Sequence, residues 1–283
     1  MIMGILNVTP DSFSDGGQHN TPAQAIKRAI EMANQGANII DIGGESTRPG
    51  AKEVSTQEQL DRVIPVIEGI RKSESKSEPE PEPEPESKKI IISIDTTDYQ
   101  VAKQALEAGA NWINDISAGE GSLSADGTEQ MITLAATKNC PIILMHRQGK
   151  SDRMQNKPTY DDVCKEVKEY LLERAQLALE AGVTKDNIIL DPGIGFGKNL
   201  EHNLALLADL ESLVKLDFPV LLGASRKRFL GEILGEDDPM QRIAATCATT
   251  ALGVQAGVNV FRVHDVIENK QAMDVAWAIR NKP

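Results

Sequence analysis

Two hydrophobic patterns alternate along the chain. Eight short apolar runs are separated by longer segments in which apolar residues recur every three or four positions. The runs cover 2–6, 38–42, 90–94, 112–116, 142–145, 188–190, 220–222 and 258–263. The longer segments predict helices near 22–35, 56–72, 98–108, 127–138, 160–181, 201–211, 239–255 and 265–280. Because the short runs are mostly apolar and do not alternate with polar residues in a period of two, they are typical of parallel strands that are buried on both faces.

Eight strand–helix units over about 250 residues are the number found in a (β/α)8 TIM barrel. We therefore predict an α/β fold with a single domain spanning residues 1–283. Gly36, Gly109 and Gly257 each stand between a predicted helix and the next strand, which is where glycine ends helices. This repeated helix-to-strand joint supports a barrel in which strands and helices alternate. An open doubly wound sheet is the alternative, and the count of eight units disfavours it.

Residues 73–88 interrupt the pattern between the second helix and the third strand. Proline at positions 79, 81, 83 and 85, each followed by glutamate, excludes both a helix and a strand ladder. We expect a disordered, low-complexity insertion within the barrel. A domain linker is the alternative, but the strand–helix pattern continues on both sides. Since helix-to-strand loops lie at the barrel end opposite the active site, deletion of 74–87 is expected to leave kcat/KM nearly unchanged.

Composition and charge narrow the class of protein. The chain has 30 basic and 42 acidic residues, a net charge of −12, and 4% aromatics, which disfavours nucleic acid as a partner. Its three cysteines contain no CxxC pair, which excludes a disulfide framework and suits a reducing cytoplasm. No apolar run approaches the roughly 20 residues that span a bilayer, and no signal peptide is recognisable. We expect a cytoplasmic enzyme without a membrane partner.

Polar residues follow the predicted strands, at the barrel end where active sites lie. Asp95 and Asp191 follow the third and sixth runs, and Asn114 lies within the fourth. Strand ends are commonly polar because turns begin there, but so many polar groups around one mouth indicate a binding site. Carboxylates that accept parallel hydrogen bonds suit a flat heterocycle with adjacent N–H donors.

Basic residues follow the last two strands. Arg226, Lys227 and Arg228 are expected to form a cationic patch with Arg262 and His264, at the position where barrels often bind phosphate. Two glycine-rich loops, 9–20 and 43–52, have the length and composition of lids. The segment that begins at Gly193 lacks the spacing of the dinucleotide fingerprint, so NAD is not expected.

Eight motifs in register resemble the dihydropteroate synthase family. They are GILNVTPDSFSDGG (4–17), DIGGESTRPGA (41–51), SIDT (93–96), INDIS (113–117), ILMH (143–146), ILDPGIGFGK (189–198), LLGASRK (221–227) and FRVHD (261–265). The resemblance covers almost the whole chain, with each motif at a predicted strand end. It implies the condensation of 6-hydroxymethyl-7,8-dihydropterin pyrophosphate with 4-aminobenzoate, which gives 7,8-dihydropteroate and pyrophosphate in folate biosynthesis. The reaction implied is a dissociative substitution, and sulfonamides are implied as inhibitors of the enzyme.

The same resemblance implies roles for individual residues. Catalytic roles fall on Asp95, Lys227, Asp15 and Arg262, and pterin binding on Asp95, Asn114, Asp191, Lys227, Met145 and Phe196. Asn7, Arg262 and His264 would bind pyrophosphate, with Asn7 as the ligand of a Mg²⁺ cofactor. Phe13, Thr47, Arg48, Pro49, Ser225 and Arg228 would contact aminobenzoate or belong to its loops. The family implies a homodimer that packs through the helices on either side of the last strand.

One residue departs from the pattern of the family, and three other functions are alternatives to the one that the resemblance implies. Arg228 stands where the family often has serine, so it either pairs with the aminobenzoate carboxylate or points into solvent. A methyltetrahydrofolate-dependent methyltransferase would need no pyrophosphate clamp, and a glycosidase would leave the cationic patch unexplained. A catalytically silent pterin-binding paralogue is disfavoured because every motif residue is present.

Overall fold

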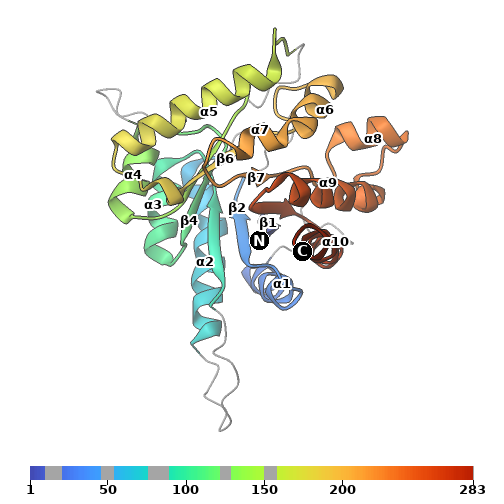
Figure 1. The fold of residues 1–283 in the computed structure, drawn as a ribbon. Helices are drawn as coiled ribbons and strands as arrows, with labels where there is room; N and C mark the ends of the chain where they lie inside the picture. Colours follow the sequence, from blue (N-terminus) through green and yellow to red (C-terminus); the bar gives the residue numbers. More distant parts are fainter. Residues whose placement is uncertain (10–20, 46–53, 76–88, 122–128, 150–157, 283) are drawn as a thin grey trace.

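The computed structural model describes residues 1–9, 21–45, 54–75, 89–121, 129–149 and 158–282, and shows a barrel of parallel strands surrounded by helices (Figure 1). The strands are β1 (Ile2–Asn7), β2 (Ile39–Gly43), β3 (Ile91–Asp95), β4 (Trp112–Asp115), β5 (Ile142–Met145), β6 (Ile188–Asp191), β7 (Leu221–Leu222) and β8 (Val260–Val263). Each strand begins and ends within two residues of the boundaries predicted for its apolar run.

The sheet closes on itself. Its strand order is β6-β5-β4-β3-β2-β1-β8-β7, with every pair parallel. A bridge between Leu190 and Val220 joins the two edge strands, and the amide of Leu190 donates to the carbonyl oxygen of Pro219 at 2.8 Å. The predicted eight-stranded barrel in a single domain is confirmed, and the doubly wound alternative is wrong.

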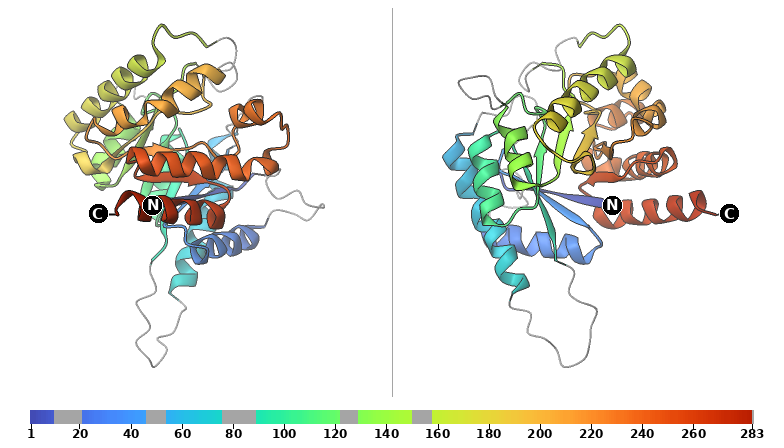
Figure 2. Two further views of the ribbon diagram at one scale, coloured as in Figure 1. Left: turned by 45° about the vertical axis from the view of Figure 1, so that its right-hand side comes forward. Right: turned by 60° about the vertical axis from the view of Figure 1, so that its left-hand side comes forward.

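The helices cover the outside of the barrel in both views of Figure 2. They are α1 (Pro22–Asn34), α2 (Thr56–Glu74), α3 (Tyr99–Ala108), α4 (Gln130–Lys138), α5 (Val163–Glu180), α6 (Leu200–Ala208), α7 (Leu210–Val214), α8 (Arg228–Leu234), α9 (Ile243–Ala256) and α10 (Val266–Arg280). Gly109 and Gly257 end α3 and α9 in the left-handed conformation, with φ of 116° and 100°, as predicted. No helix in the described part of the chain is long and apolar enough to cross a membrane.

Three helical details differ from the prediction. The segment predicted at 201–211 is divided between α6 and α7, and the segment at 239–255 begins with a 3-10 turn, Pro239–Arg242. The short helix α8 was not predicted at all. It has only seven residues and ends at Gly235, which has a φ of 66°, so it is too short to show a helical repeat of apolar positions.

Side chains of alternating strand positions fill the barrel. Met3, Ile39, Ile143, Ile189, Leu221 and Val260 form a small apolar cluster separate from the main core. These residues come from six different strands, so the interior of the barrel is where they meet. Two positions further along β2 and β3 stand Asp41 and Ser93, which pair in register. Since side chains two apart share one face of a strand, the interior becomes polar toward the carboxyl ends of the strands.

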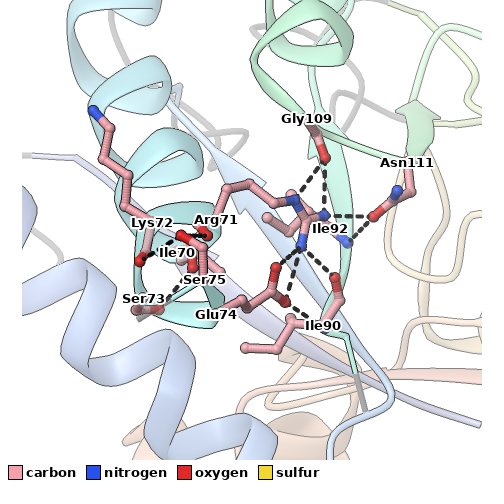
Figure 3. A network of polar contacts seen from close by, with 10 residues as sticks. All are labelled: Ile70, Arg71, Lys72, Ser73, Glu74, Ser75, Ile90, Ile92, Gly109 and Asn111. Carbon is pink, nitrogen blue, oxygen red and sulfur yellow. Dashed lines mark hydrogen bonds and ion pairs between the residues drawn. The ribbon is translucent and has the colours of Figure 1, made fainter. Parts of the chain in front are cut away.

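A polar network closes the joint between α2 and β3 (Figure 3). The Arg71 guanidinium donates to the carbonyl oxygens of Ile90 at 2.8 Å and Gly109 at 2.8 Å, and to the side chain of Asn111 at 2.7 Å. Glu74 forms an ion pair with Arg71 at 2.9 Å and accepts from the Ile90 amide at 2.7 Å. The ends of the two elements are thus fixed to each other by side chains.

The predicted start of the insertion at residue 73 is therefore wrong, because α2 continues through Glu74. Ser73 and Glu74 are helical, and the hydroxyl of Ser73 donates to the carbonyl oxygen of Ile70 at 2.6 Å. The proline-rich run itself lies outside the described residues, so its disorder stays a prediction. The boundary matters because Glu74 belongs to the network that fixes the joint.

We expect two deletions in this region to behave differently. Replacement of 76–88 by a short Gly-Ser linker retains Glu74 and should leave Tm within about 2 °C of the parent. Deletion of 74–87 removes Glu74 and its charged hydrogen bonds, and should cost about 1.5–3 kcal/mol, or roughly 3–10 °C in Tm. Thermal unfolding of the two variants checks this. Equal Tm values would show that Glu74 contributes nothing to the joint.

Candidate active site at the barrel mouth

The strand register brings three predicted site residues, Asn7, Asp95 and Asn114, to one level of the barrel. Gly43 of β2 pairs with Asn7 of β1 and with Asp95 of β3, and Asp95 pairs in turn with Asn114 of β4. On the other side of the mouth, Met145 of β5 pairs with Asp191 of β6. Asp95, Asn114, Met145 and Asp191 are all buried. The acceptor groups predicted from the strand ends therefore do line one mouth.

Arg262 lies among these acceptors. Its Nε donates to Asp41 Oδ2 at 2.6 Å, and one terminal nitrogen donates to Asp95 Oδ2 at 2.6 Å. The Asn114 amide donates to the same Asp41 oxygen at 3.0 Å. One guanidinium thus joins carboxylates of β2 and β3 across the mouth, which fixes their orientation.

Asp41 is a site residue that sequence reasoning missed. It is 1% exposed, and its second carboxylate oxygen, Oδ1, has no hydrogen-bond partner in the described part of the chain. A signal was present in the sequence: Asp41 interrupts the apolar run Ile39–Ile42 and is two positions before Gly43. A buried charge within a strand of a barrel needs an opposite charge, and Arg262 is that charge.

A tight turn after β6 presents Asp191 and Phe196. The Gly193 amide donates to Asp191 Oδ1 at 2.7 Å, and Gly193, Gly195 and Gly197 all have positive φ. A side chain at Gly193 would clash with the carbonyl oxygen of His146, at 1.9 Å from its Cβ, so this close approach requires glycine. The sequence Gly-x-Gly-x-Gly builds a turn against β5 here, and no dinucleotide loop.

Lys227 closes the other side of the mouth. Its ammonium group donates to the carbonyl oxygen of Ile194 and lies 4.1 Å from the centroid of the Phe196 ring. Ser225 Oγ lies 3.0 Å from His264 Nδ1, which links the loops after β7 and β8. Phe196, Lys227, Ser225 and His264 therefore lie together, as the sequence predicted.

The predicted cationic patch is only partly present. Arg226 has a φ of 57° and forms a two-point ion pair with Asp265, at 2.9 and 2.5 Å. Arg228 is 85% exposed at its side chain and pairs with Glu232 in α8 at 2.8 Å. Both cations are paired with carboxylates, Arg226 with Asp265 next to His264 and Arg228 with Glu232 at the surface, so neither adds an uncompensated charge to the predicted patch. Of the two orientations open to Arg228, the structure has the one toward solvent.

Five predicted site residues cannot be placed. Phe13 and Asp15 of the first loop, and Thr47, Arg48 and Pro49 of the second, lie outside the described residues.

Burial dominates the electrostatics of the mouth. It raises the pKa of Asp95 to about 7, although Arg262 opposes the rise, and it raises the pKa of Asp191 against the opposing charge of Lys227. Burial lowers the pKa of Lys227 to about 7, with Asp191 opposing. For Arg262 burial also disfavours the charge, but Asp41 and Asp95 outweigh it and raise the pKa. Asp191 and Arg262 act on each other electrostatically, so the two side chains lie near each other.

These shifts predict how stability depends on pH. The folded state holds the Asp95 proton more tightly than the unfolded chain, so Asp95 contributes stability below about pH 4 that is lost as the pH rises toward 7. Lys227 binds its proton less tightly when folded, so its contribution rises between pH 7 and 10.5. We expect a minimum of stability near neutral pH in the unliganded protein. Denaturation curves from pH 4 to 10 check this, and Asp95→Asn should flatten the acidic limb; an unchanged limb would contradict the assignment.

Asn7 is the candidate metal ligand. No group of three His, Cys, Asp or Glu side chains among the described residues could hold a metal ion. A Cβ built on Gly43 would lie 3.7 Å from Asn7 Oδ1 and 3.6 Å from Asp95 Oδ2, so the missing side chain leaves a small space between two oxygens. Mg²⁺ commonly takes one or two protein oxygens and completes its coordination with water and substrate phosphates. The donor set around Gly43 fits that mode of binding.

A mouth of this kind, with buried carboxylates and an amide facing an aromatic ring and a lysine, suits a flat heterocycle with several N–H donors. The family model described as pterin binding enzyme matches residues 3–264. This places the fold and the site in the pterin-binding class of barrels.

Individual relatives narrow the class. The chain is 45% identical to dihydropteroate synthase of Synechocystis sp. over 278 residues, which is 98% of this chain and 89% of the relative. A crystal structure of Yersinia pestis dihydropteroate synthase in complex with a sulfonamide drug matches with a TM-score of 0.85 and 41% identity, over 99% and 94% of the two chains. The Xanthomonas albilineans enzyme in complex with 7,8-dihydropteroate matches with a TM-score of 0.83 and 38% identity, over 100% and 94%. The chain belongs to the dihydropteroate synthase family.

Proposed function

We propose that the chain condenses 6-hydroxymethyl-7,8-dihydropterin pyrophosphate with 4-aminobenzoate, giving 7,8-dihydropteroate and pyrophosphate in folate biosynthesis. It is a transferase of alkyl or aryl groups other than methyl. The observation that carries the proposal is the meeting of Asp95, Asn114 and Asp191 with Lys227 and Arg262 at one barrel mouth. A relative with 45% identity carries the same enzyme name.

The pterin would bind between two sides of the mouth. Asp191, whose Oδ2 is not used by the Gly193 amide, can accept from the amino group and a ring N–H, with Asn114 beside it. Lys227 lies over Phe196 of the same turn, where it can donate to a ring carbonyl or nitrogen. Met145 is buried next to Asp191 in register and supplies an apolar wall.

Departure of pyrophosphate requires positive charge near the leaving group. Arg262 already pairs with Asp41 and Asp95, so it brings little uncompensated charge to a diphosphate. This supports a Mg²⁺ cofactor held by Asn7 and by the substrate itself. When bound, Mg²⁺ would neutralise charge that develops on the departing pyrophosphate. Arg262 and His264 would orient the diphosphate, with His264 positioned by its contact with Ser225.

The residues favour a dissociative substitution, in which pyrophosphate leaves before the weakly nucleophilic arylamine attacks. The cation that remains is conjugated with the pterin ring. Asp95 and Asp41 lie on the same side of the mouth, and their carboxylates stabilise developing positive charge there. No strong general base is needed, since the amine becomes acidic once it has attacked.

The aminobenzoate pocket is assigned to the loops. We assign Ser225 and Phe196 to this pocket among the described residues, and Phe13, Asp15, Thr47, Arg48 and Pro49 would complete it from loops outside the described residues. Arg228 contributes only if its side chain leaves Glu232. We propose sulfonamides, which resemble 4-aminobenzoate, as inhibitors that bind there.

One assay separates the proposed function from its alternatives. Pyrophosphate release should require the pterin substrate, 4-aminobenzoate and Mg²⁺ together, and chelation with EDTA should abolish it until Mg²⁺ is restored. A methyltransferase or a silent paralogue would release no pyrophosphate under any of these conditions. Release that is independent of 4-aminobenzoate would indicate simple hydrolysis and would contradict the proposed reaction.

We also propose a homodimer that forms through α9 and α10, which pack against each other beside β8 (Figure 2). Leu252 of α9 and Val275, Trp277 and Ile279 of α10 are all more than half exposed. Apolar side chains of this size gather on a surface where a partner covers them. Sedimentation should show a dimer that Trp277→Glu dissociates; a monomeric parent protein would contradict the proposal. The free thiols of Cys140, Cys164 and Cys247 suit a cytoplasmic location, which we propose as well.

A further inference from the structure

Lys198 is a buried lysine for which the proposed reaction has no role so far. It stands at the end of the turn after β6, and only 3% of it is exposed. Its ammonium nitrogen lies 3.0 Å from His146 Nδ1, 3.0 Å from the carbonyl oxygen of Phe196 and 3.4 Å from that of His146. No carboxylate within the described ranges forms an ion pair with it. Burial without a paired carboxylate lowers the pKa of Lys198 to about 7, although the charge of Asp191 opposes the shift, so the ammonium form dominates below about pH 7 and is held at a cost that calls for an explanation.

The acceptors of Lys198 are held rigidly. Burial, with the charge of Lys198, lowers the pKa of His146 to about 3, so its ring is neutral and Nδ1 can accept. The ring packs against Tyr160 and Tyr170, with centroids 6.0 and 5.0 Å away. The Tyr160 hydroxyl donates to the carbonyl oxygen of Gly197 at 2.8 Å, next to Lys198 in the chain. The ammonium group therefore has one fixed place.

That place is behind the pterin-facing side of the turn. The carbonyl that accepts from Lys198 belongs to Phe196, whose ring lies under Lys227. The amide of His146 donates to the carbonyl oxygen of Asp191 at 3.0 Å, so Lys198 and Asp191 are attached to the same strand end. The positive charge of Lys198 also lowers the pKa of Asp191, against the rise that burial causes.

We infer that Lys198 is a positioning residue for pterin binding: its ammonium, fixed between His146 and the Phe196 carbonyl, holds the turn that presents Asp191 and Phe196 and keeps positive charge behind the Asp191 carboxylate. This inference rests on the proposed function. Lys198 does not touch the ligand in this arrangement and acts through Asp191 and Phe196.

Three charged groups and one neutral histidine surround Asp191, each from a different strand or strand end. Lys227 lies after β7, Arg262 is in β8, and Lys198 follows β6 itself, while the neutral His146 follows β5. Lys227 and Arg262 act more strongly on Asp191 than Lys198 does. Removal of the Lys198 charge should therefore shift the protonation of Asp191 by a limited amount, upward in pH.

The test compares loss of the positive charge of Lys198 with loss of a neutral hydrogen bond that supports the same turn. Lys198→Met removes the charge and retains the length of the side chain, and Lys198→Gln is a second neutral variant if the first does not fold. Asn203→Ala is the matched control, because the Asn203 side chain accepts from the Gly195 amide at 2.7 Å and supports the same turn without charge. The Kd for 6-hydroxymethylpterin is measured by calorimetry from pH 5 to 9, with Tm recorded for each protein.

Both kinds of variant should weaken binding, by about tenfold. Only the neutral Lys198 variants should move the acidic limb of the binding profile upward in pH, because Asp191 then loses its charge at a higher pH. Lys198→Arg should return the limb toward that of the parent. An unmoved limb in Lys198→Met or Lys198→Gln would overturn the inference and leave a structural role only. If the parent protein does not bind the pterin at all, the proposed function fails first.

Discussion

Replacement of Arg262 by methionine is expected to damage folding and catalysis together. The side chain is 21% exposed and pairs with two buried carboxylates, Asp41 and Asp95, at 2.6 Å each. Removal of one member of a buried ion pair costs about 3–5 kcal/mol, because the partner charges are left uncompensated. In a domain of this size that corresponds to a fall in Tm of roughly 6–20 °C.

The catalytic loss should exceed what unfolding explains. With Arg262 absent, Asp41 and Asp95 lose their common donor and the diphosphate loses a group that orients it, so kcat/KM should fall by about 10²–10³-fold at a temperature where the variant is folded. Arg280→Met is a suitable control, since Arg280 is an exposed arginine at the end of α10 that donates to the Val254 carbonyl at 2.9 Å and contacts none of the residues of the mouth named above. Normal kcat/KM in a folded Arg262→Met protein would refute the assignment of Arg262 to the reaction.

Lys227→Met is expected to separate stability from binding. Burial lowers the pKa of Lys227 to about 7, so the fold holds this ammonium group at a cost that a methionine side chain does not have. We expect Tm to stay the same or rise near pH 7. Because a hydrogen bond to a charged group contributes about 1.5–3 kcal/mol, pterin affinity should fall by roughly 10- to 150-fold.

Calorimetric titration with a pterin and thermal unfolding of the same samples measure the two effects. Lys215→Met is the control, because the exposed Lys215 pairs only with Glu211 on the surface. The parent protein should gain stability between pH 7 and 10.5, and Lys227→Met should gain less over that range. A variant that binds pterin as well as the parent, or that unfolds far below it, would show that Lys227 has a structural role instead.

The sequence predicted the barrel because its strands are buried on both faces. Such strands appear as continuous apolar runs, and Gly109 and Gly257 mark the joints between helix and strand. The short helix α8 and the division of α6 from α7 were missed, since a helix of five to seven residues gives too few turns for a periodic pattern. Similarly, the end of α2 could not be recognised from Ser73 and Glu74 alone, because their helical state depends on contacts with Arg71 and Ile90.

The sequence predicted most of the residues that belong to the candidate site, but it predicted fewer of the ion pairs that these residues form. The positions of Asp95, Asn114, Asp191 and Lys227 follow from the rule that strand ends meet at one mouth. The partners of Arg226 and Arg228 do not follow from it: one turns to Asp265 and the other to Glu232, and only coordinates show this. Asp41 could have been recognised from the alternation of side chains along a strand, because it shares a face of β2 with Gly43.

The joint between α2 and β3 has a practical consequence. Arg71 and Glu74 hold both sides of the joint whatever peptide connects them, and the joint lies at the end of the barrel away from the reacting groups. A fluorescent reporter or an immobilisation tag spliced between positions 75 and 89 should leave turnover intact. The enzyme could then be anchored to a sensor surface with its mouth facing the medium.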